Sequence, residues 1–462
     1  MKQSAINGGD NSLLLDLAAY AERYRDSETP LDLTIDPAAL KRGFDIGLPD
    51  KGRPARDVLA DLVEAAEPGI VGSTKPGFLS WVIGASHEAG VAADWLTSLW
   101  GQNAGLYQTS PSAAACEDVV STWLLDLLDL PRESSVGFAT GATMATFTCL
   151  AVARSEVLRR IGYDVDKRGL QCAPRVTVLI GADAHVSNKV ALRYLGFGSD
   201  NIVEVEAGPD GVMSADALRA AAAKVSGPTI IISQAGHIHT GAFDDFAAAA
   251  EVARRLDAWH HVDGAFGLWA RAAPGRRHLA EDVELADSWA TDGHKWLQTP
   301  YDSGFAIVRD PAAHRRAMTK AAGYLNGTDE EGRNPANYVP ELSRRARGFS
   351  AWAMLQTLGR DGIAMMVERH CAAAARLAER CAAIPGVGIL GPVVLNQVAI
   401  TVDGREEEVC DRLNATGDFF LRTAEWRGQT IIRASFCGQP SGPDTADALA
   451  DALQHIMKDQ QP

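Results

Sequence analysis

Two segments of the sequence place a carboxylate and an amine where they could act on one ligand. The run HVDGAF at residues 261–266 contains Asp263, and the run DGHKW at residues 292–296 contains Lys295. Each of these side chains comes just after a predicted buried strand, and open α/β sheets bind their ligands beyond the carboxyl ends of the strands. A lone lysine in such a place is ordinarily a solvated loop residue, so the inference depends on the pair.

An aspartate and a lysine in one crevice suit pyridoxal phosphate. Burial favours the unprotonated amine, which can bind the cofactor aldehyde as a Schiff base. The carboxylate keeps the pyridine nitrogen protonated, so that the ring can accept electrons from a bond broken at the substrate Cα. We therefore expect Lys295 and Asp263 to fill these two roles.

Two further segments could complete such a site. The turn TGAT at residues 140–143 runs into a predicted helix, whose first N–H groups and dipole would bind a phosphate together with the Thr143 hydroxyl. Turns of this composition are common, so this signal is weak by itself. His185 follows a predicted strand, where its ring could stack on the pyridine, although a helix-capping or surface histidine is the usual alternative.

Two other motifs have plainer interpretations. His237 and His239 are two residues apart after a predicted strand, a spacing that a metal site could use. No further ligands are close, and Asp244 and Asp245 are better explained as the N-cap of the next helix, so we expect local hydrogen bonding and no metal. A G-x-G-x-x-G match at residues 386–391 lies between a predicted helix and a predicted strand, which favours a turn over a dinucleotide site.

The composition disfavours several classes of partner. The chain has 462 residues, a net charge of −15 and 7 cysteines. An acidic surface repels nucleic acid and anionic membranes, which leaves a small molecule as the expected partner. The cysteines are scattered without a C-x-x-C pair, the first residues do not resemble a secretory signal, and no apolar run reaches the roughly 20 residues of a membrane span. We expect a cytoplasmic protein with free thiols.

Short β-branched runs alternate with helical segments, which predicts an α/β fold with a mostly parallel central sheet. The predicted strands are residues 176–180, 202–205, 229–233, 260–262, 288–291 and 304–308, and a helix is expected at 245–259. We expect an N-terminal helical arm at residues 1–85, a large domain at 86–350 and a small C-terminal α+β domain at 351–462 with strands at 397–402 and 430–436.

Together these motifs resemble the pyridoxal-phosphate-dependent group II decarboxylases. That family includes aromatic-L-amino-acid, glutamate and cysteine-sulfinate decarboxylases, and this chain looks closest to the aromatic branch. The similarity extends from about residue 33 to about residue 457 and includes PGFLSW at 76–81, TSP at 109–111 and SRRAR at 343–347. It implies a fold-type I enzyme, similar to aspartate aminotransferase, that releases the α-carboxylate of an L-amino acid as CO2.

The resemblance implies roles for the motif residues. The pyridine ring would be bound by Lys295 at the aldehyde, Asp263 at the nitrogen, and His185 and Ala265 on its two faces. The phosphate would be bound by Ala142, Thr143 and His294, and Asp292 stands where the family has an Asn or Asp that supports the phosphate end. His237 stands where relatives commonly have Thr or Asn near the cofactor's phenolic oxygen, so the cofactor's electronics and the substrate could differ here.

The resemblance also implies a mobile lid. Tyr324, in a polar and glycine-rich stretch, matches the tyrosine that in this family protonates the substrate carbanion across the interface of a homodimer. Related aldehyde synthases usually have phenylalanine at this position. Tyr324 therefore favours simple decarboxylation to an amine.

The substrate is less constrained by the sequence. Trp81 and Trp100 fall in segments that form the specificity wall in the aromatic branch, without the cationic residue that an acidic substrate would need. We expect an aromatic or other apolar L-amino acid, unless both tryptophans are core residues. Either Arg347 or Arg433 could bind the α-carboxylate. Alternatives are oxidative deamination to an aldehyde, transamination, and a catalytically silent scaffold protein, which the intact Lys, Asp and His set disfavours.

Overall fold

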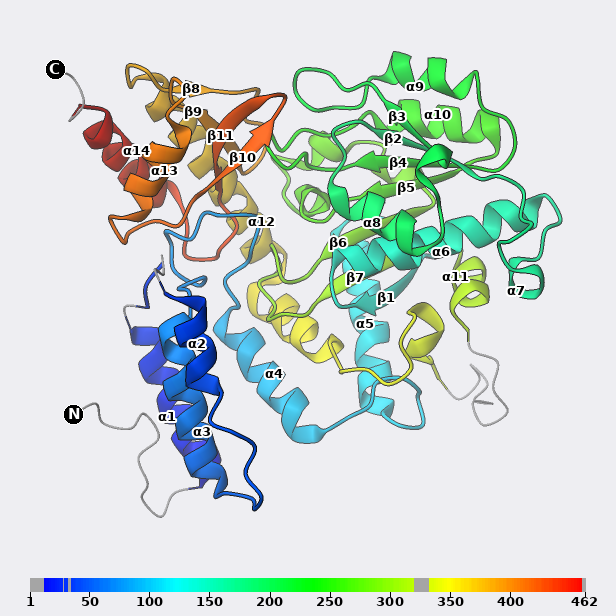
Figure 1. Ribbon diagram of the computed structural model, residues 1–462. Coiled ribbons are helices and arrows are strands. Elements are labelled where there is room, and N and C mark those ends of the chain that lie inside the picture. Colours follow the sequence, from blue (N-terminus) through cyan, green and yellow to red (C-terminus); the bar gives the residue numbers. More distant parts are fainter. Residues whose placement is uncertain (1–11, 28, 32–34, 320–331, 459–462) are drawn as a thin grey trace, which may run out of the picture.

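Two β-sheets connected by one long helix organise the chain (Figure 1). The structure is a computed structural model, and it describes residues 12–27, 29–31, 35–319 and 332–458. The larger sheet has seven strands in the order β1-β7-β6-β5-β4-β2-β3, and the smaller sheet has four in the order β10-β11-β9-β8.

The large sheet confirms the predicted α/β fold. Its strands are β1 (Ser135–Ala139), β2 (Thr177–Gly181), β3 (Ile202–Val205), β4 (Thr229–Gln234), β5 (Trp259–Asp263), β6 (Ser288–Asp292) and β7 (Gly304–Val308). Strands β2 to β6 are parallel, whereas β7 is antiparallel to both of its neighbours, β1 and β6. Every residue of these strands is buried except in the edge strand β3, which explains their nearly continuous apolar runs.

Helices cover both faces of this sheet. Val178 and Ile180 pack in one core with α6 (Ala142–Arg160), α8 (Val186–Tyr194) and α11 (Pro311–Met318). Leu179 packs in another core with α9 (Ala215–Ala222) and α10 (Phe246–Leu256). This alternation follows from the two-residue period of a strand. A short helix, α7 (Val165–Arg168), contacts α6 on this face. No helix among the described residues has the length and apolarity to cross a membrane.

The small sheet is antiparallel and lies near the C-terminus. Its strands are β8 (Gly388–Ile389), β9 (Gln397–Thr401), β10 (Arg422–Trp426) and β11 (Gln429–Ser435), and α13 (Glu406–Asn414) and α14 (Pro443–Lys458) pack beside them. The long α12 (Gly348–Ala382) has a kink at Gly359 and contacts α4 (Glu88–Trp100) and α5 (Pro111–Leu127) as well as α14 and β9. It therefore crosses the predicted boundary at residue 350, and the domain limits stay a prediction.

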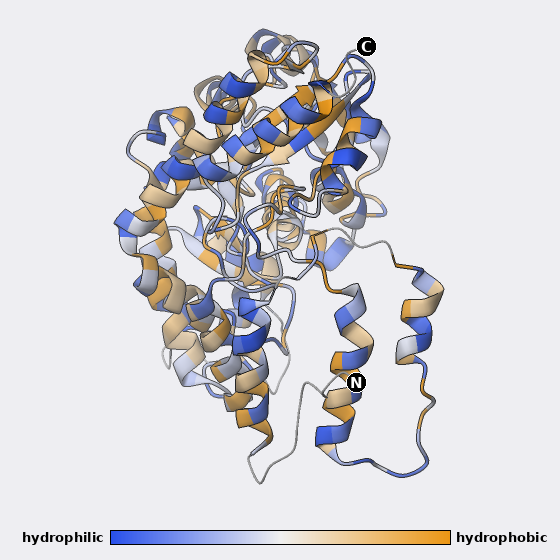
Figure 2. Ribbon diagram, turned by 90° about the vertical axis from the view of Figure 1, so that its left-hand side faces the viewer, coloured by the Kyte–Doolittle hydropathy of each residue, from blue (hydrophilic) through white to orange (hydrophobic). Residues whose placement is uncertain are grey.

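The N-terminal helices stand apart from the rest in both views (Figure 1 and Figure 2). They are α1 (Leu13–Asp26), α2 (Pro37–Phe44) and α3 (Ala55–Ala66). Large apolar side chains on this arm are exposed to solvent, namely Leu14, Leu15, Phe44, Ile46, Leu48, Val58 and Leu62. The arm thus presents apolar surface that the described chain does not cover.

Some local predictions need correction. Strand β1 was not expected, and Trp259 belongs to β5, because α10 ends at Leu256 and is followed by Asp257 in a left-handed conformation. Asp245 caps α10 as expected, but Asp244 instead accepts hydrogen bonds from the backbone of Met213 and Gln234. The glycine motif at residues 386–391 forms a turn and the short β8.

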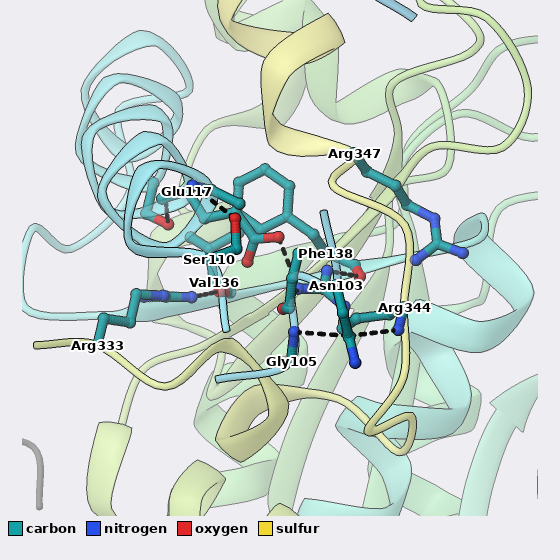
Figure 3. A network of polar contacts seen from close by, with 12 residues as sticks. Asn103, Gly105, Ser110, Glu117, Val136, Phe138, Arg333, Arg344 and Arg347 are labelled. Atoms are coloured by element: carbon teal, nitrogen blue, oxygen red, sulfur yellow. Dashed lines mark hydrogen bonds and ion pairs between the residues drawn. The ribbon is translucent and has the colours of Figure 1, made fainter. Parts of the chain in front are cut away.

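A buried ion pair anchors the strand that leads to the TGAT turn (Figure 3). Arg344 donates to Glu117 at 2.6 Å, with both side chains 1 % exposed, and also to the carbonyl groups of Ala104 and Phe138. Asn103 accepts from the backbone of Arg344 at 3.1 Å. Because Phe138 is the penultimate residue of β1, these contacts fix the strand end from which the turn departs.

Candidate active site

The register of β5 with β6 brings the two predicted carboxylates to one edge of the sheet. Asp263, the last residue of β5, pairs with Ala290, and Asp292 is the last residue of β6. The connection continues beyond the strands, since the backbone N–H of Asp292 donates to the Ala265 carbonyl at 3.0 Å. The turn that follows Asp292 carries Lys295, so the amine lies at the same edge.

One cavity of about 320 Å³ opens at this edge. Among its lining residues are seven of the predicted site residues: Ala142, Thr143, His185, Ala265, Asp292, His294 and Lys295. Asp263 is buried just below this lining, 4 % exposed. The predicted residues that line this cavity thus come from segments up to 153 positions apart in the sequence, from Ala142 to Lys295.

The start of α6 forms an anion site in this cavity. The Ala142 N–H donates to Asp292 Oδ1 at 2.5 Å, and Lys295 Nζ lies 3.0 Å from Asp292 Oδ2. Gly141 permits this close packing, because a Cβ there would lie 3.1 Å from the His294 ring. The other N–H groups of the first turn have no intrahelical acceptors. With the Thr143 hydroxyl nearby, the donors present fit a phosphate group.

His185 combines the two alternatives that the sequence left open. It is the N-cap of α8, where its Nδ1 accepts from the Ser187 N–H and lies 2.7 Å from the Ser187 hydroxyl, and its ring lines the cavity. The residue is exposed to solvent, yet partial desolvation by the surrounding atoms lowers the pKa of its ring. A neutral ring with an accepting Nδ1 carries its proton on Nε2.

Asp263 is held by two donors. Its Oδ2 accepts from Asn188 Nδ2 at 2.6 Å, and its Oδ1 accepts from the Ala265 N–H at 3.2 Å. The carboxylate therefore has a fixed orientation before any ligand binds. Its side chain can meet a cationic ring nitrogen without reorganisation.

The histidines after β4 lie outside the cavity lining. The His237 ring is 5.3 Å from those of His239 and Trp426, and its Nδ1 is 3.2 Å from the Thr240 hydroxyl. Burial lowers the pKa of His237 to about 4 and that of His239 to about 3. This arrangement supports the expected local hydrogen bonding, and the position of His237 relative to the cofactor's phenolic oxygen stays a prediction.

The remaining predicted residues do not line the cavity of the described chain. Trp81 is 47 % exposed beside Phe420, and Trp100 is 48 % exposed with its ring against Phe349. The alternative that both are core residues is therefore wrong. Tyr324 lies outside the described residues.

Gln298 is a site residue that the sequence did not reveal. Its side chain is fully buried and makes four hydrogen bonds: to the carbonyls of Lys295 and Cys437 at 2.8 Å, and from the N–H groups of Ala85 at 2.8 Å and Gln439 at 2.9 Å. It thus joins the Lys295 turn to the N-terminal segment and to the chain after β11. Its other three partners are distant in sequence, and a glutamine three residues after a lysine gives no signal of this role.

Two more residues were missed. Tyr301 lines the cavity and stacks on His294 with ring centroids 4.2 Å apart. Asn188, which contacts Asp263, is fully buried on α8. A single tyrosine in a turn and a single asparagine inside a helix belong to no sequence motif, so the sequence could not identify either as a site residue.

The chain is similar to known proteins over most of its length. The family model described as "Pyridoxal-dependent decarboxylase conserved domain" matches residues 37–400. The chain is 27% identical to a 4-hydroxyphenylacetaldehyde synthase of Rhodiola rosea, over 83% of this chain and 82% of that one. It is 28% identical to an L-2,4-diaminobutyrate decarboxylase of Rhizobium meliloti, over 80% and 75%. The crystal structure of Oryza sativa TDC with PLP and tryptamine has the same fold, with a TM-score of 0.89, 22% identity and 97% of each chain covered.

We predict that Gln298→Leu loosens the Lys295 turn. The change leaves four backbone groups without their partner, which should lower the free energy of unfolding by about 2–4 kcal/mol and weaken the binding of added pyridoxal phosphate. Denaturant unfolding and a cofactor titration followed by absorbance measure the two effects. Gln397→Leu is the control, because Gln397 is equally buried but its side chain makes one hydrogen bond with the described residues, to Ser435 in the small sheet. Equal cofactor affinity in both variants would contradict the role of Gln298.

Proposed function

The chain belongs to the pyridoxal-dependent decarboxylase family, and from that premise we propose that it converts an aromatic or other apolar L-amino acid into the amine and CO2. It is a carboxy-lyase whose cofactor is pyridoxal phosphate. When bound, the cofactor supplies the electron sink for the bond broken at the substrate Cα. Lys295 would bind its aldehyde, Asp263 its ring nitrogen, and the start of α6 with Thr143 and His294 its phosphate.

The charge of the cavity wall carries the proposal on substrate class. Among the described lining residues, Lys295 is the sole lysine and there is no arginine, so an acidic side chain would find no free cation. The one carboxylate, Asp292, already contacts Ala142 and Lys295, so an amino side chain would find no free anion. Val82, Met144 and Tyr301 offer apolar contact instead.

Arg433 is the residue that we propose to bind the substrate α-carboxylate. It lies on β11 and is mostly buried, and its side chain makes no hydrogen bond or ion pair with the described residues. Burial lowers the pKa of Arg433 to about 10, and its charge contributes to the lowered pKa of His185, which supports a guanidinium near the cavity. Arg347, the other candidate, pairs with Asp302 at 2.8 Å. An unpaired guanidinium suits a carboxylate, which it can bind through two hydrogen bonds.

Proton delivery completes the proposed reaction. Loss of CO2 leaves an electron pair at Cα, and Tyr324 would donate its hydroxyl proton there. The neutral His185, with its proton on Nε2, would pack on the ring without adding a charge beside it.

We also propose a homodimer. The apolar side chains of the N-terminal arm are exposed, and so are Leu96, Leu99 and Trp100 on α4. Exposed apolar surface of this extent is typical of an interface. Two copies that cover these faces would give a solution mass of twice 49.2 kDa, which sedimentation equilibrium measures, and a mass of one chain would contradict the proposal.

A substrate panel tests the substrate class. With L-phenylalanine, L-tyrosine, L-tryptophan, L-glutamate and L-2,4-diaminobutyrate, we expect kcat/KM for the best aromatic substrate to exceed that for either charged one by at least about tenfold, because unpaired charges are costly in the cavity. Amine and CO2 are quantified together. A charged amino acid as the best substrate would contradict the proposal.

Arg433→Met tests carboxylate recognition. The variant keeps the length of the side chain and removes the charge, so KM should rise at least about tenfold, whereas pyridoxal phosphate binding should stay the same. Arg347→Met, which breaks a pair with Asp302, is the matched control. If Arg347→Met alone raises KM, the assignment to Arg433 is wrong.

Tyr324→Phe tests which group protonates Cα. Without the phenol proton, the product should shift from amine toward aldehyde, with oxygen consumed and ammonia and peroxide released. An aldehyde is the expected product because one relative of this chain is a 4-hydroxyphenylacetaldehyde synthase. Product analysis by chromatography is the measurement, and unaltered amine output would remove Tyr324 from the mechanism.

A further inference from the structure

Asn188 connects Asp263, which is buried below the cavity, to His185, which lines it. It lies on α8, is 0 % exposed, and donates through Nδ2 to Asp263 Oδ2 at 2.6 Å and to the His185 carbonyl at 3.2 Å. Its Oδ1 is buried without a hydrogen-bond partner. An amide oxygen left unpaired in the interior destabilises a fold. The asparagine side chain at this position therefore lowers the stability of the fold through its Oδ1, while its Nδ2 donates to Asp263 and to the His185 carbonyl.

We propose that Asn188 is a positioning residue that fixes the Asp263 carboxylate and so sets how firmly the enzyme holds the ring nitrogen of its cofactor. This inference rests on the proposed role of Asp263. It deepens that role by naming the group that orients the carboxylate.

The contacts of Asp263 support this assignment. Each of its oxygens accepts one described N–H group, Asn188 on Oδ2 and Ala265 on Oδ1. At 4 % exposure, water has little access to replace either donor. The bond from Asn188 is the shorter of the two, and it is the one that a side-chain change can remove. Without it, the carboxylate can rotate about its last bond, and a preorganised contact with a cation becomes one that must be ordered on binding.

The second hydrogen bond of Asn188 extends the effect to His185. The His185 backbone N–H donates to Gln234 at 3.0 Å, and its carbonyl accepts from Asn188. The amide thus links the strand end that carries Asp263 to the helix start that carries the ring-stacking histidine. One side chain holds together the groups proposed for the nitrogen and for one face of the same ring.

Asn188→Leu tests the inference in the reconstituted full-length protein. Loss of a hydrogen bond to a charged group should raise the dissociation constant of pyridoxal phosphate at least about tenfold. The pH dependence of the visible absorbance of the bound cofactor should also shift, which a purely structural defect would not cause. Asn188→Ser, which is too short to reach Asp263 and adds no bulk, should give the same results and serves if the leucine variant does not fold.

Asn414→Leu is the matched control. Asn414 is also buried and makes two hydrogen bonds with Leu421 in the small domain, so this variant should lose stability but keep the cofactor affinity and spectrum of the parent. Asp263→Asn is measured in parallel. If it leaves affinity and spectrum unchanged, the proposed role of Asp263 is wrong and the inference falls with it. If Asp263→Asn changes both but the Asn188 variants behave like Asn414→Leu, the inference alone is overturned.

Discussion

The parallel register of β5 with β6 is the constraint on which the rest of the site depends. With Asp263 opposite Ala290, the two strands end close together, and the turn after Asp292 must bring Lys295 back over the same edge. The chain then returns as β7, antiparallel to β6 and beside β1, so the TGAT turn at the end of β1 reaches the same place. One register thus brings together a carboxylate, an amine and a helix N-terminus, which are the three groups that pyridoxal phosphate needs.

The groups at this edge also explain how a chain with a net negative charge can bind an anion. The chain carries a net charge of −15, yet the start of α6 already attracts a carboxylate, that of Asp292, which is paired with Lys295. The oriented N–H groups and the amine act on an anion within a few ångströms. The net charge acts on it from farther away, where salt screens the interaction. An acidic protein can therefore hold an anionic cofactor.

Sequence reasoning succeeded where the signal was local or chemical. The apolar runs of β2, β4, β6 and β7 identified buried strands, and the order of strand and helix indicated the parallel sheet. The expectation that Asp263 and Lys295 lie at one edge of the sheet followed from the requirement of one chemistry for both groups, and the register of β5 with β6 confirms that edge. By contrast, β1 is short and was missed, because the five residues from Ser135 to Ala139 resemble a loop next to the TGAT turn.

Contacts between distant segments could not be predicted in this way. Asn188 and Asp263 are 75 positions apart, and Gln298 and Ala85 are 213 apart. Such bonds depend on how helices and turns pack in three dimensions, and a single polar residue leaves no periodic pattern. For the same reason the sequence did not distinguish Arg347 from Arg433 as the partner of the substrate α-carboxylate, and the ion pair of Arg347 with Asp302 is the observation that favours Arg433 in our proposal.

Lys295 is the residue that we propose to bind the cofactor aldehyde, and this bond can be trapped chemically. Protein loaded with pyridoxal phosphate can be treated with sodium borohydride, which makes the bond to the lysine permanent, and then digested and analysed by mass spectrometry. The account predicts one modified peptide, with the pyridoxyl mass on Lys295. Modification of another lysine in place of Lys295, or the absence of any modified peptide, would contradict it.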